Sequence, residues 1–308
     1  MAPLGNSGIP TETRVLFNTF AQRADFDVSG LLVENTDRKS QFLARSPRKP
    51  HEREMHASAF LHILSGGDPP FGVSRLAGRM RDLRVTAALY RNDKFGLVPM
   101  PTETFDDALW RLLFAASVPP QDRKTITQRP FYYTNMTFWE VVASVELPFA
   151  PRPNLQMPDD FDFIVLQDAR PIQAPRGVTK IIRYHDAIPV TDPDLIGDSR
   201  YSRIHEACVR RSVGHAHFVC NSTATRDALI GLFPQAEPMT HVIPCVVNAD
   251  VAPESAIIPP HDVIRTRRMA QVRDGGSSDA KSPAAPKFVA AGDLTPTAPY
   301  VLAVTTLE

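Results

Sequence analysis

The chain has 308 residues and a formal net charge of zero, with 43% hydrophobic and 22% charged residues. This is the composition of a globular protein that can bury a sizeable core. Because phosphate contacts require a surplus of basic side chains, the charge balance gives no reason to expect nucleic-acid binding. Three cysteines far apart in sequence imply neither a disulfide framework nor a CxxC metal site. These are Cys208, Cys220 and Cys245.

No targeting segment is recognisable in the sequence. The N-terminus lacks the basic start and apolar run of a secretory signal. No stretch approaches the roughly 20 apolar residues that span a bilayer. We therefore expect a cytoplasmic protein with reduced thiols.

The N-terminal part of the chain carries weak patterns. We predict a disordered lead-in over residues 1–13. The β-branched and aromatic content of RVLFNTFA (14–21) predicts a strand. The stretch 22–57 is polar and poorly periodic, which predicts a loop with one helical turn.

Helical patterns become clearer in the next segment. HASAFLHILSGG (56–67) predicts a helix that ends at its two glycines, and FGVSRLAGRMRDL (71–83) predicts a second helix. VTAALY (85–90) predicts a strand. TFDDALWRLLFAA (104–116) predicts an amphipathic helix with acidic residues in its first turn.

From residue 160 onward, apolar runs alternate with amphipathic stretches. Short apolar runs bounded by turn residues predict four strands that are buried on both faces. These strands are 162–167, 179–186, 217–222 and 241–248. Helices are predicted from about residue 198 and over 223–233, the second being ended by Pro234. The alternation indicates an α/β protein with a Rossmann-like parallel sheet and flanking helices.

The C-terminal segment has a different character. Residues 251–298 are predicted to form a partly disordered linker, because the stretch DGGSSDAKSPAAPK (274–287) within them contains few apolar residues. An apolar strand, 299–308, follows it. We therefore predict one Rossmann-like domain over 14–250, the linker, and the first strand of a second domain that is truncated.

Four motifs occur in order between residues 160 and 308. They are His185-Asp186 after a strand, Ser222 with Thr225 to Leu229 at the start of a helix, Val242-Ile243-Pro244 on the next strand, and Tyr300 to Glu308. In this order and spacing, the segment resembles the retaining glycosyltransferases of family 4, which have the two-domain GT-B fold.

The resemblance implies the N-terminal, acceptor-side domain of such an enzyme. It implies transfer of a hexose from a nucleotide sugar, such as a GDP- or UDP-hexose, to a glycan or lipid-linked acceptor, with retention and without a metal or other cofactor. The chain departs from the family pattern at 220–223 (CNST) and 245–248 (CVVN), and it ends before the Pro-Arg-Lys-Asn of the donor-binding domain. We therefore expect weak or absent turnover, and a partner that carries the missing domain.

His185 is the first candidate for a catalytic role. It follows an apolar strand, and open α/β sheets bind their ligands at the carboxyl ends of strands. An imidazole there could hydrogen-bond the transferred sugar or the leaving diphosphate, and donate a proton near neutral pH. Asp186, the second catalytic candidate, could orient His185 or the acceptor. The alternatives are a histidine that bonds a backbone carbonyl and an aspartate that forms a turn.

Asn221, Ser222 and Thr223 are candidates for substrate binding. They lie between a strand and a helix N-terminus, where backbone N–H groups and the helix dipole favour a phosphate or a sugar hydroxyl. N-capping of the helix is the alternative reading for each of them.

Two further patterns suggest metal binding, but each has a simpler reading. Asp160-Phe161-Asp162 is an Asp-x-Asp motif that precedes a strand, and His215-Ala216-His217 has no carboxylate or cysteine cluster beside it. We therefore predict no metal site. The arginine-rich runs 203–211 and 265–268 favour solvated helix faces. Contact with an anionic acceptor, or with lipid headgroups at the inner face of a membrane, is the alternative.

The sequence thus predicts a glycosyltransferase. The alternative from another class is a non-catalytic remnant or binding module that keeps affinity for an acceptor or partner. An unrelated α/β hydrolase has little support, because the chain lacks a GxSxG elbow, a P-loop and a GxGxxG fingerprint.

Overall fold

The structure is a computed structural model. It describes residues 8–33, 49–65, 80, 83–84, 86–87, 90–91, 94–134, 145–146, 149, 154–157, 161–170, 172–245 and 299–305. The chain divides into two compact units, of which the first comprises Met1–Val246 and Thr297–Glu308 and the second Val247–Pro296. The second unit, and with it nearly all of the predicted linker, lies outside the described residues.

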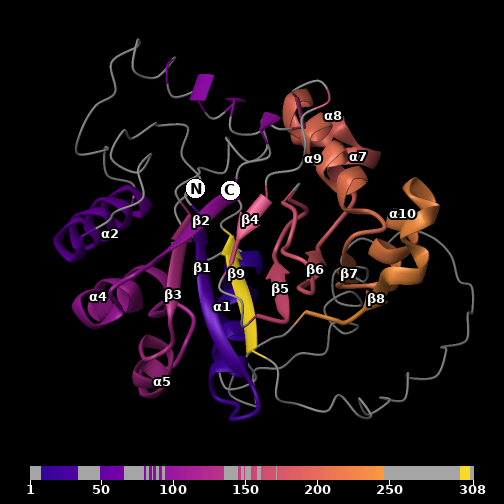
Figure 1. Cartoon of the computed structure of the whole chain (residues 1–308). Coiled ribbons are helices and arrows are strands. Elements are labelled where there is room, and N and C mark those ends of the chain that lie inside the picture. Colours follow the sequence, from indigo (N-terminus) through magenta and orange to yellow (C-terminus); the bar gives the residue numbers. More distant parts are fainter. Residues whose placement is uncertain are drawn as a thin grey trace, which may run out of the picture. The chain divides into compact units, whose positions relative to one another are not determined.

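The described part of the first unit is built on a nine-stranded sheet (Figure 1). Its strands are β1 (Asp27–Val33), β2 (Lys94–Pro99), β3 (Phe131–Thr134), β4 (Asn154–Gln156), β5 (Phe163–Leu166), β6 (Thr179–Tyr184), β7 (His217–Cys220), β8 (Thr240–Val242) and β9 (Pro299–Thr305). They lie in the order β4-β2-β3-β1-β9-β5-β6-β7-β8. All neighbouring pairs are parallel except β2 and β3, which are antiparallel.

Helices occupy many of the connections between these strands. They are α1 (Gly8–Ala21), α2 (Pro50–Leu64), α4 (Thr102–Leu109), α5 (Arg123–Thr127), α7 (Ile188–Thr191), α8 (Pro193–Ile196), α9 (Ser199–Ser212) and α10 (Thr223–Leu232). Shorter segments are the π-helical η1 (Trp110–Phe114) and the 3-10 turns η2 (Pro120–Asp122) and η3 (Pro234–Met239). No described helix is long and apolar enough to cross a membrane.

The region from β5 to β8 confirms the predicted α/β class. Its four strands are all parallel, with α9 and α10 in the connections, which is compatible with a Rossmann-like sheet. Ile164, Ile182 and Phe218 at the centre of three of these strands are at most 1% exposed. Asp198 and Ser222 cap α9 and α10 by accepting backbone N–H bonds in the first turn.

Strand β1 contributes to two hydrophobic cores. Alternate residues of a strand point to opposite faces of the sheet. Leu31 and Val33 belong to a core with β5, β6, β7, α9 and α10, whereas Val28 and Leu32 belong to a core with α1, α2 and η1. The strand is therefore covered on both faces.

The predictions for the N-terminus are wrong where the structure describes it. Residues 14–21, predicted as a strand, form the second part of α1, and residues 8–13 of the predicted lead-in form its first part. The buried residues Thr13, Phe17 and Ala21 recur every four positions, which is the spacing of a helix face. This periodicity outweighs the β-branched and aromatic content.

Strand β1 lies within the stretch 22–57, which was predicted as a loop. The strand has seven residues and is defined by its pairing with β3 and β9, two segments that are distant in sequence. The predicted strand 85–90 is also wrong, because the described residues in it (86, 87 and 90) are helical. Residues 1–7 and 71–79 lie outside the described residues.

Two of the three helices predicted between residues 56 and 116 are present, and in the third, over 71–83, the described residues 80 and 83 are helical. The helix over 56–67 is confirmed as the C-terminal part of α2. The helix over 104–116 corresponds to α4 followed by η1, where the N–H of Ala115 bonds the carbonyl of Trp110 five residues earlier, at 2.9 Å. This bond is the mark of a π-helical turn, which sequence periodicity does not reveal.

Strand β9 pairs with β1 on one side and with β5 on the other. Residues 299–305 therefore lie within the sheet of the first unit, whereas the sequence predicted that 299–308 opens a second domain. The apolar run identifies the strand correctly, but it carries no information about the strands with which it pairs.

Gly30 on β1 lies against the ring of its partner on β3, Phe131. A methyl group at Gly30 would lie 2.3 Å from a ring carbon. We predict that Gly30→Ala lowers the free energy of unfolding, measured with urea, by about 1–3 kcal/mol because it overpacks the core. In Gly231→Ala on α10, the methyl group meets nothing within 4 Å. The free energy of unfolding of this control variant should rise by about 0.5–1 kcal/mol. Equal effects would contradict the described packing of β1 on β3.

Candidate functional site

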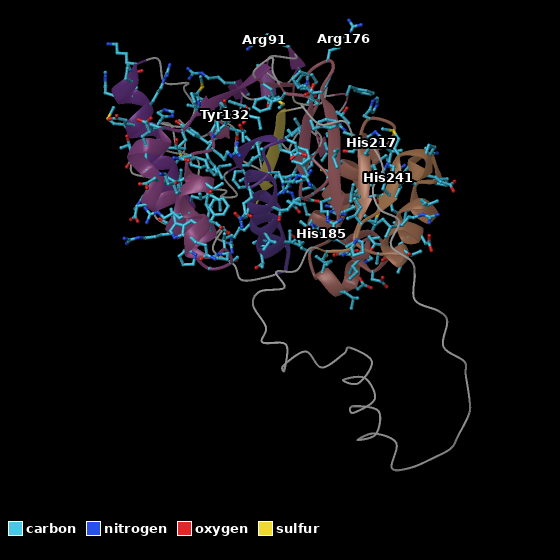
Figure 2. All side chains as sticks on the ribbon, turned by 90° about the horizontal axis from the view of Figure 1, so that it is seen from below. Arg91, Tyr132, Arg176, His185, His217 and His241 are labelled. Carbon is cyan, nitrogen blue, oxygen red and sulfur yellow. The ribbon has the colours of Figure 1, made fainter. Side chains whose placement is uncertain are left out.

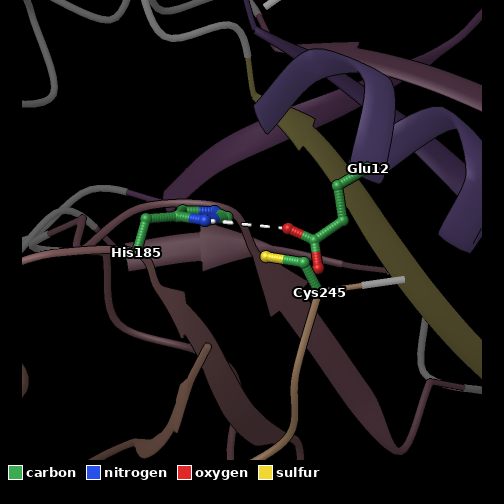
Figure 3. Close-up of side chains that lie close together, drawn as sticks. All are labelled: Glu12, His185 and Cys245. Carbon is green, nitrogen blue, oxygen red and sulfur yellow. Dashed lines mark ion pairs between the residues drawn. The ribbon is translucent and has the colours of Figure 1, made fainter. Parts of the chain in front are cut away.

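The candidate site lies at the carboxyl end of β6, where His185 directly follows the strand. Its ring atom Nε2 lies 3.2 Å from Oε1 of Gln167, at the end of β5. Its Nδ1 lies 3.7 Å from Oε2 of Glu12 on α1 (Figure 3). The first distance is that of a hydrogen bond and the second is too long for one. The side chain is 10% exposed, so the ring is largely but not completely buried.

Glu12 is held in place by Arg183 of β6. Nε and Nη2 of Arg183 donate to Oε1 of Glu12 at 3.1 and 2.6 Å, and Nη1 donates to the carbonyl of Ile243. The two side chains are 5% and 6% exposed. This buried pair ties α1 to the central strands and aims Oε2 of Glu12 at His185.

The surroundings of His185 favour a neutral ring. Burial lowers the pKa of His185 below its ordinary value of 6.5, and the charge of Arg183 acts in the same direction. The carboxylates of Glu12, Asp168 and Asp186 oppose this shift, but burial has the largest effect. With the amide oxygen of Gln167 facing Nε2, that nitrogen carries the proton, so Nδ1 directs a lone pair toward Glu12.

Cys245 lies beside these two side chains. One ligand atom each from Glu12, His185 and Cys245 falls within 4.8 Å of the other two, and Cys245 is exposed while Glu12 is buried (Figure 3). Burial raises the pKa of the Cys245 thiol, as does the charge of Glu12. Among the described residues, this is the group of His, Cys and acidic side chains that is close enough to share one cation. The structure thus assembles a possible metal-ligand set that the sequence analysis did not predict.

The predicted substrate-binding turn lies next to the backbone of His185. Oγ1 of Thr225 lies 3.3 Å from the His185 carbonyl and 2.8 Å from Oδ1 of Asn221. Ser222 caps α10 by accepting the N–H of Thr225 at 3.1 Å, and Thr223 is the first residue of that helix. The ends of β6 and β7 are therefore joined, as expected for neighbouring parallel strands.

Asp186, the second catalytic candidate, forms a turn. Its Oδ1 accepts the N–H of Ile188 at 3.0 Å, which matches the structural alternative considered for it. The side chain of His185 therefore lies beside Glu12, Gln167 and Cys245. The side chain of Asp186 instead stabilises the turn at the start of α7.

A second polar cluster supports the segment that carries Gln167. Oδ2 of Asp168 lies 3.3 Å from Nη2 of Arg170, and its Oδ1 lies 3.7 Å from Nδ1 of His205 on α9. Nζ of Lys180 donates to the carbonyl of Ile172 at 3.1 Å. The side chains of Asp168, Arg170, Lys180 and His205 are all buried. Together they hold the loop after β5 against β6 and α9.

Some buried polar atoms in this region have no hydrogen-bond partner among the described residues. They include Nε2 of Gln167, the hydroxyl of Tyr184 and Nε2 of His205. Burial raises the pKa of Tyr184 well above its ordinary value, so the hydroxyl keeps its proton. A buried polar atom without a partner is costly, and a polar ligand or an ordered water would satisfy it.

One histidine of the His-x-His motif, His217, lies beside a histidine of the neighbouring strand. Nδ1 of His217 on β7 lies 3.2 Å from Nε2 of His241 on β8, and both rings are labelled on neighbouring strands in Figure 2. Sequence spacing did not suggest this pair, because its members are 24 residues apart. In the Asp-x-Asp motif, Asp162 directly precedes β5, as predicted, and Asp160 lies outside the described residues.

Sequence reasoning missed Glu12, Gln167, Arg183 and Cys245 as members of the site. Glu12 is 171 residues from Arg183 and fell in the predicted lead-in. The one local signal was a charged Arg183 inside an apolar strand. No protein-family model matches the chain, and no curated protein and no solved structure matches it. The functional assignment therefore depends on the residues of this cluster and on the motif order.

Proposed function

We propose that this chain is the acceptor-side half of a family-4-type glycosyltransferase of the GT-B fold, in which His185 contacts the hexose transferred from a nucleotide sugar. The observation that carries the proposal is the position of His185 at the carboxyl end of a parallel strand, beside the turn at 221–223. Open α/β sheets bind ligands at this edge. The order of the three motifs at 185–186, 222–229 and 242–244 along the sequence supports the same assignment. The fourth motif does not, because residues 299–305 pair with β1 and β5 within the same sheet.

Nδ1 is the ring atom of His185 that we assign to the ligand. Nε2 is hydrogen-bonded to Gln167, whereas Nδ1 makes no direct hydrogen bond to Glu12. A neutral ring accepts a hydrogen bond from a sugar hydroxyl at Nδ1, and the nearby carboxylate stabilises the ring if it takes up a proton. The N-terminus of α10 offers its helix dipole to the leaving diphosphate.

The test is release of nucleoside diphosphate from a panel of GDP- and UDP-hexoses incubated with the full chain. We expect slow release from at least one member of the panel. His185→Ala should reduce that rate about 100-fold, the usual loss for a group that transfers a proton. His217→Ala, which removes an imidazole from a different edge of the sheet, should leave the rate unchanged. Equal rates for the wild type and His185→Ala would refute the assignment.

A non-catalytic binding module is the second candidate function. The observation that favours it is the coverage of His185, whose side chain is only 10% exposed. Under this alternative, a nucleotide sugar or glycan binds to the chain and no diphosphate is released by the wild type. Equilibrium binding measured alongside release therefore separates the two functions.

A further inference from the structure

The cluster of Glu12, His185 and Cys245 has the spacing of a metal site. Zinc ligands at bond lengths of about 2.1 Å in tetrahedral geometry lie about 3.4 Å from each other. Nδ1 of His185 and Oε2 of Glu12 are 3.7 Å apart, and the three ligand atoms all fall within 4.8 Å. Closing these separations to about 3.4 Å would bring all three ligand atoms onto one ion.

The orientation of the histidine ring is that of a metal ligand. Nδ1 directs its lone pair toward a carboxylate oxygen at a distance too long for a shared proton. A cation between the two atoms would convert this repulsion into attraction. Nε2 meanwhile donates to Oε1 of Gln167 at 3.2 Å. Metal-binding histidines typically use their second nitrogen in this way, which fixes the tautomer and the ring orientation.

The chemistry of the three side chains selects the ion. A thiolate, an imidazole and a carboxylate are the donors that zinc prefers, whereas magnesium and calcium prefer oxygen alone. The guanidinium of Arg183 opposes a cation here, since it donates to Glu12. The thiolate of Cys245 supplies the second negative charge that offsets it. Because Cys245 is exposed, an ion can enter from its side.

We propose that Glu12, His185 and Cys245 bind one zinc ion, with a fourth position open to solvent. This goes beyond the proposed function, in which no metal takes part in transfer. Because the ion would occupy Nδ1 of His185, zinc is expected to inhibit any reaction that uses this ring. The cation site does not depend on the identity of the sugar ligand, and it is tested without one.

The experiment is a cobalt titration of the metal-free full chain, carried out in the His241→Ala background to remove the exposed His217–His241 pair as a competing site. Cobalt(II) reports zinc sites through visible d–d bands and a thiolate-to-cobalt charge-transfer band. We expect one equivalent to bind with both signals. Cys208 and Cys220 are buried, so the charge-transfer band reports on Cys245.

Three further measurements decide the outcome. Zinc should displace the cobalt, and excess magnesium should not. Adding Cys245→Ser, at an exposed position, should abolish the charge-transfer band and weaken binding at least tenfold. Gln167→Leu should weaken binding about 10–100-fold, as for other partners of a ligating histidine. Absence of cobalt binding in the His241→Ala protein, or binding that survives Cys245→Ser with its charge-transfer band intact, would overturn the proposal.

Discussion

Replacing Glu12 with alanine is expected to lower the free energy of unfolding by about 3–5 kcal/mol, because it leaves the buried guanidinium of Arg183 without its carboxylate. Both side chains are at most 6% exposed, and the shorter contact between them is 2.6 Å. The pair also joins α1 to β6, so its loss releases the N-terminal helix from the strand that precedes His185. Urea denaturation of the full chain measures the effect.

Two matched variants separate the buried ion pair from a general effect of charge. Glu206→Ala removes an i,i+4 ion pair with Arg210 on the surface. The side chains of Glu206 and Arg210 are 40% and 68% exposed. This substitution should lower the free energy of unfolding by less than about 0.5 kcal/mol. The double variant Glu12→Leu/Arg183→Met replaces the pair with apolar groups and should recover most of the lost stability. A loss in Glu12→Ala no larger than that in Glu206→Ala would contradict the burial of the pair.

The second large effect is expected at Asp168. Asp168→Ala should destabilise the fold by about 3–5 kcal/mol, because Arg170 loses the carboxylate beside it in a buried setting. The side chains of Arg170 and Asp168 are 4% and 9% exposed. Asp168 also accepts the backbone N–H of Ala169 at 2.7 Å. Thermal or urea unfolding reads out the loss.

Asp168→Asn tests how much of this effect is electrostatic. The amide oxygen can keep the bond to the backbone, but the charge beside Arg170 is lost, so the loss of stability should be smaller than in Asp168→Ala. Asp227→Ala is the surface control, since Asp227 is 63% exposed and lies 3.9 Å from Arg226. A loss of stability in Asp168→Ala as small as that in Asp227→Ala would contradict the buried contacts of Asp168 with Arg170 and His205.

The region after residue 160 was predictable because its signals are local. Strands such as 163–166 are continuous apolar runs, and capping residues such as Asp198 and Ser222 begin the helices α9 and α10. These features require only near neighbours in sequence, and so the four parallel strands and two long helices were found. The position of His185 at a strand end followed from the same pattern.

The N-terminal half and the composition of the site depend on distant contacts. Strand β1 pairs with β3 and β9, and its apolar residues were overlooked because the stretch 22–57 around them is polar. Glu12 reaches His185 only because α1 packs against β1 and β9 and its Glu12 pairs with Arg183 of β6. Cys245 reaches His185 only after the chain has left β8. No spacing rule connects residues 12, 185 and 245, so the cluster could not be predicted from the sequence.

The most direct test of the proposed function is to observe His185 itself during ligand binding. The chain contains nine histidines, and labelling their rings with ¹³C and ¹⁵N allows each to be followed by NMR. On addition of the GDP- and UDP-hexose panel to metal-free protein, the resonances of His185 should shift for at least one ligand while those of His217 and His241 stay in place. If no ligand shifts the signals of His185, or if His217 and His241 respond in its stead, the sugar site does not lie at the end of β6.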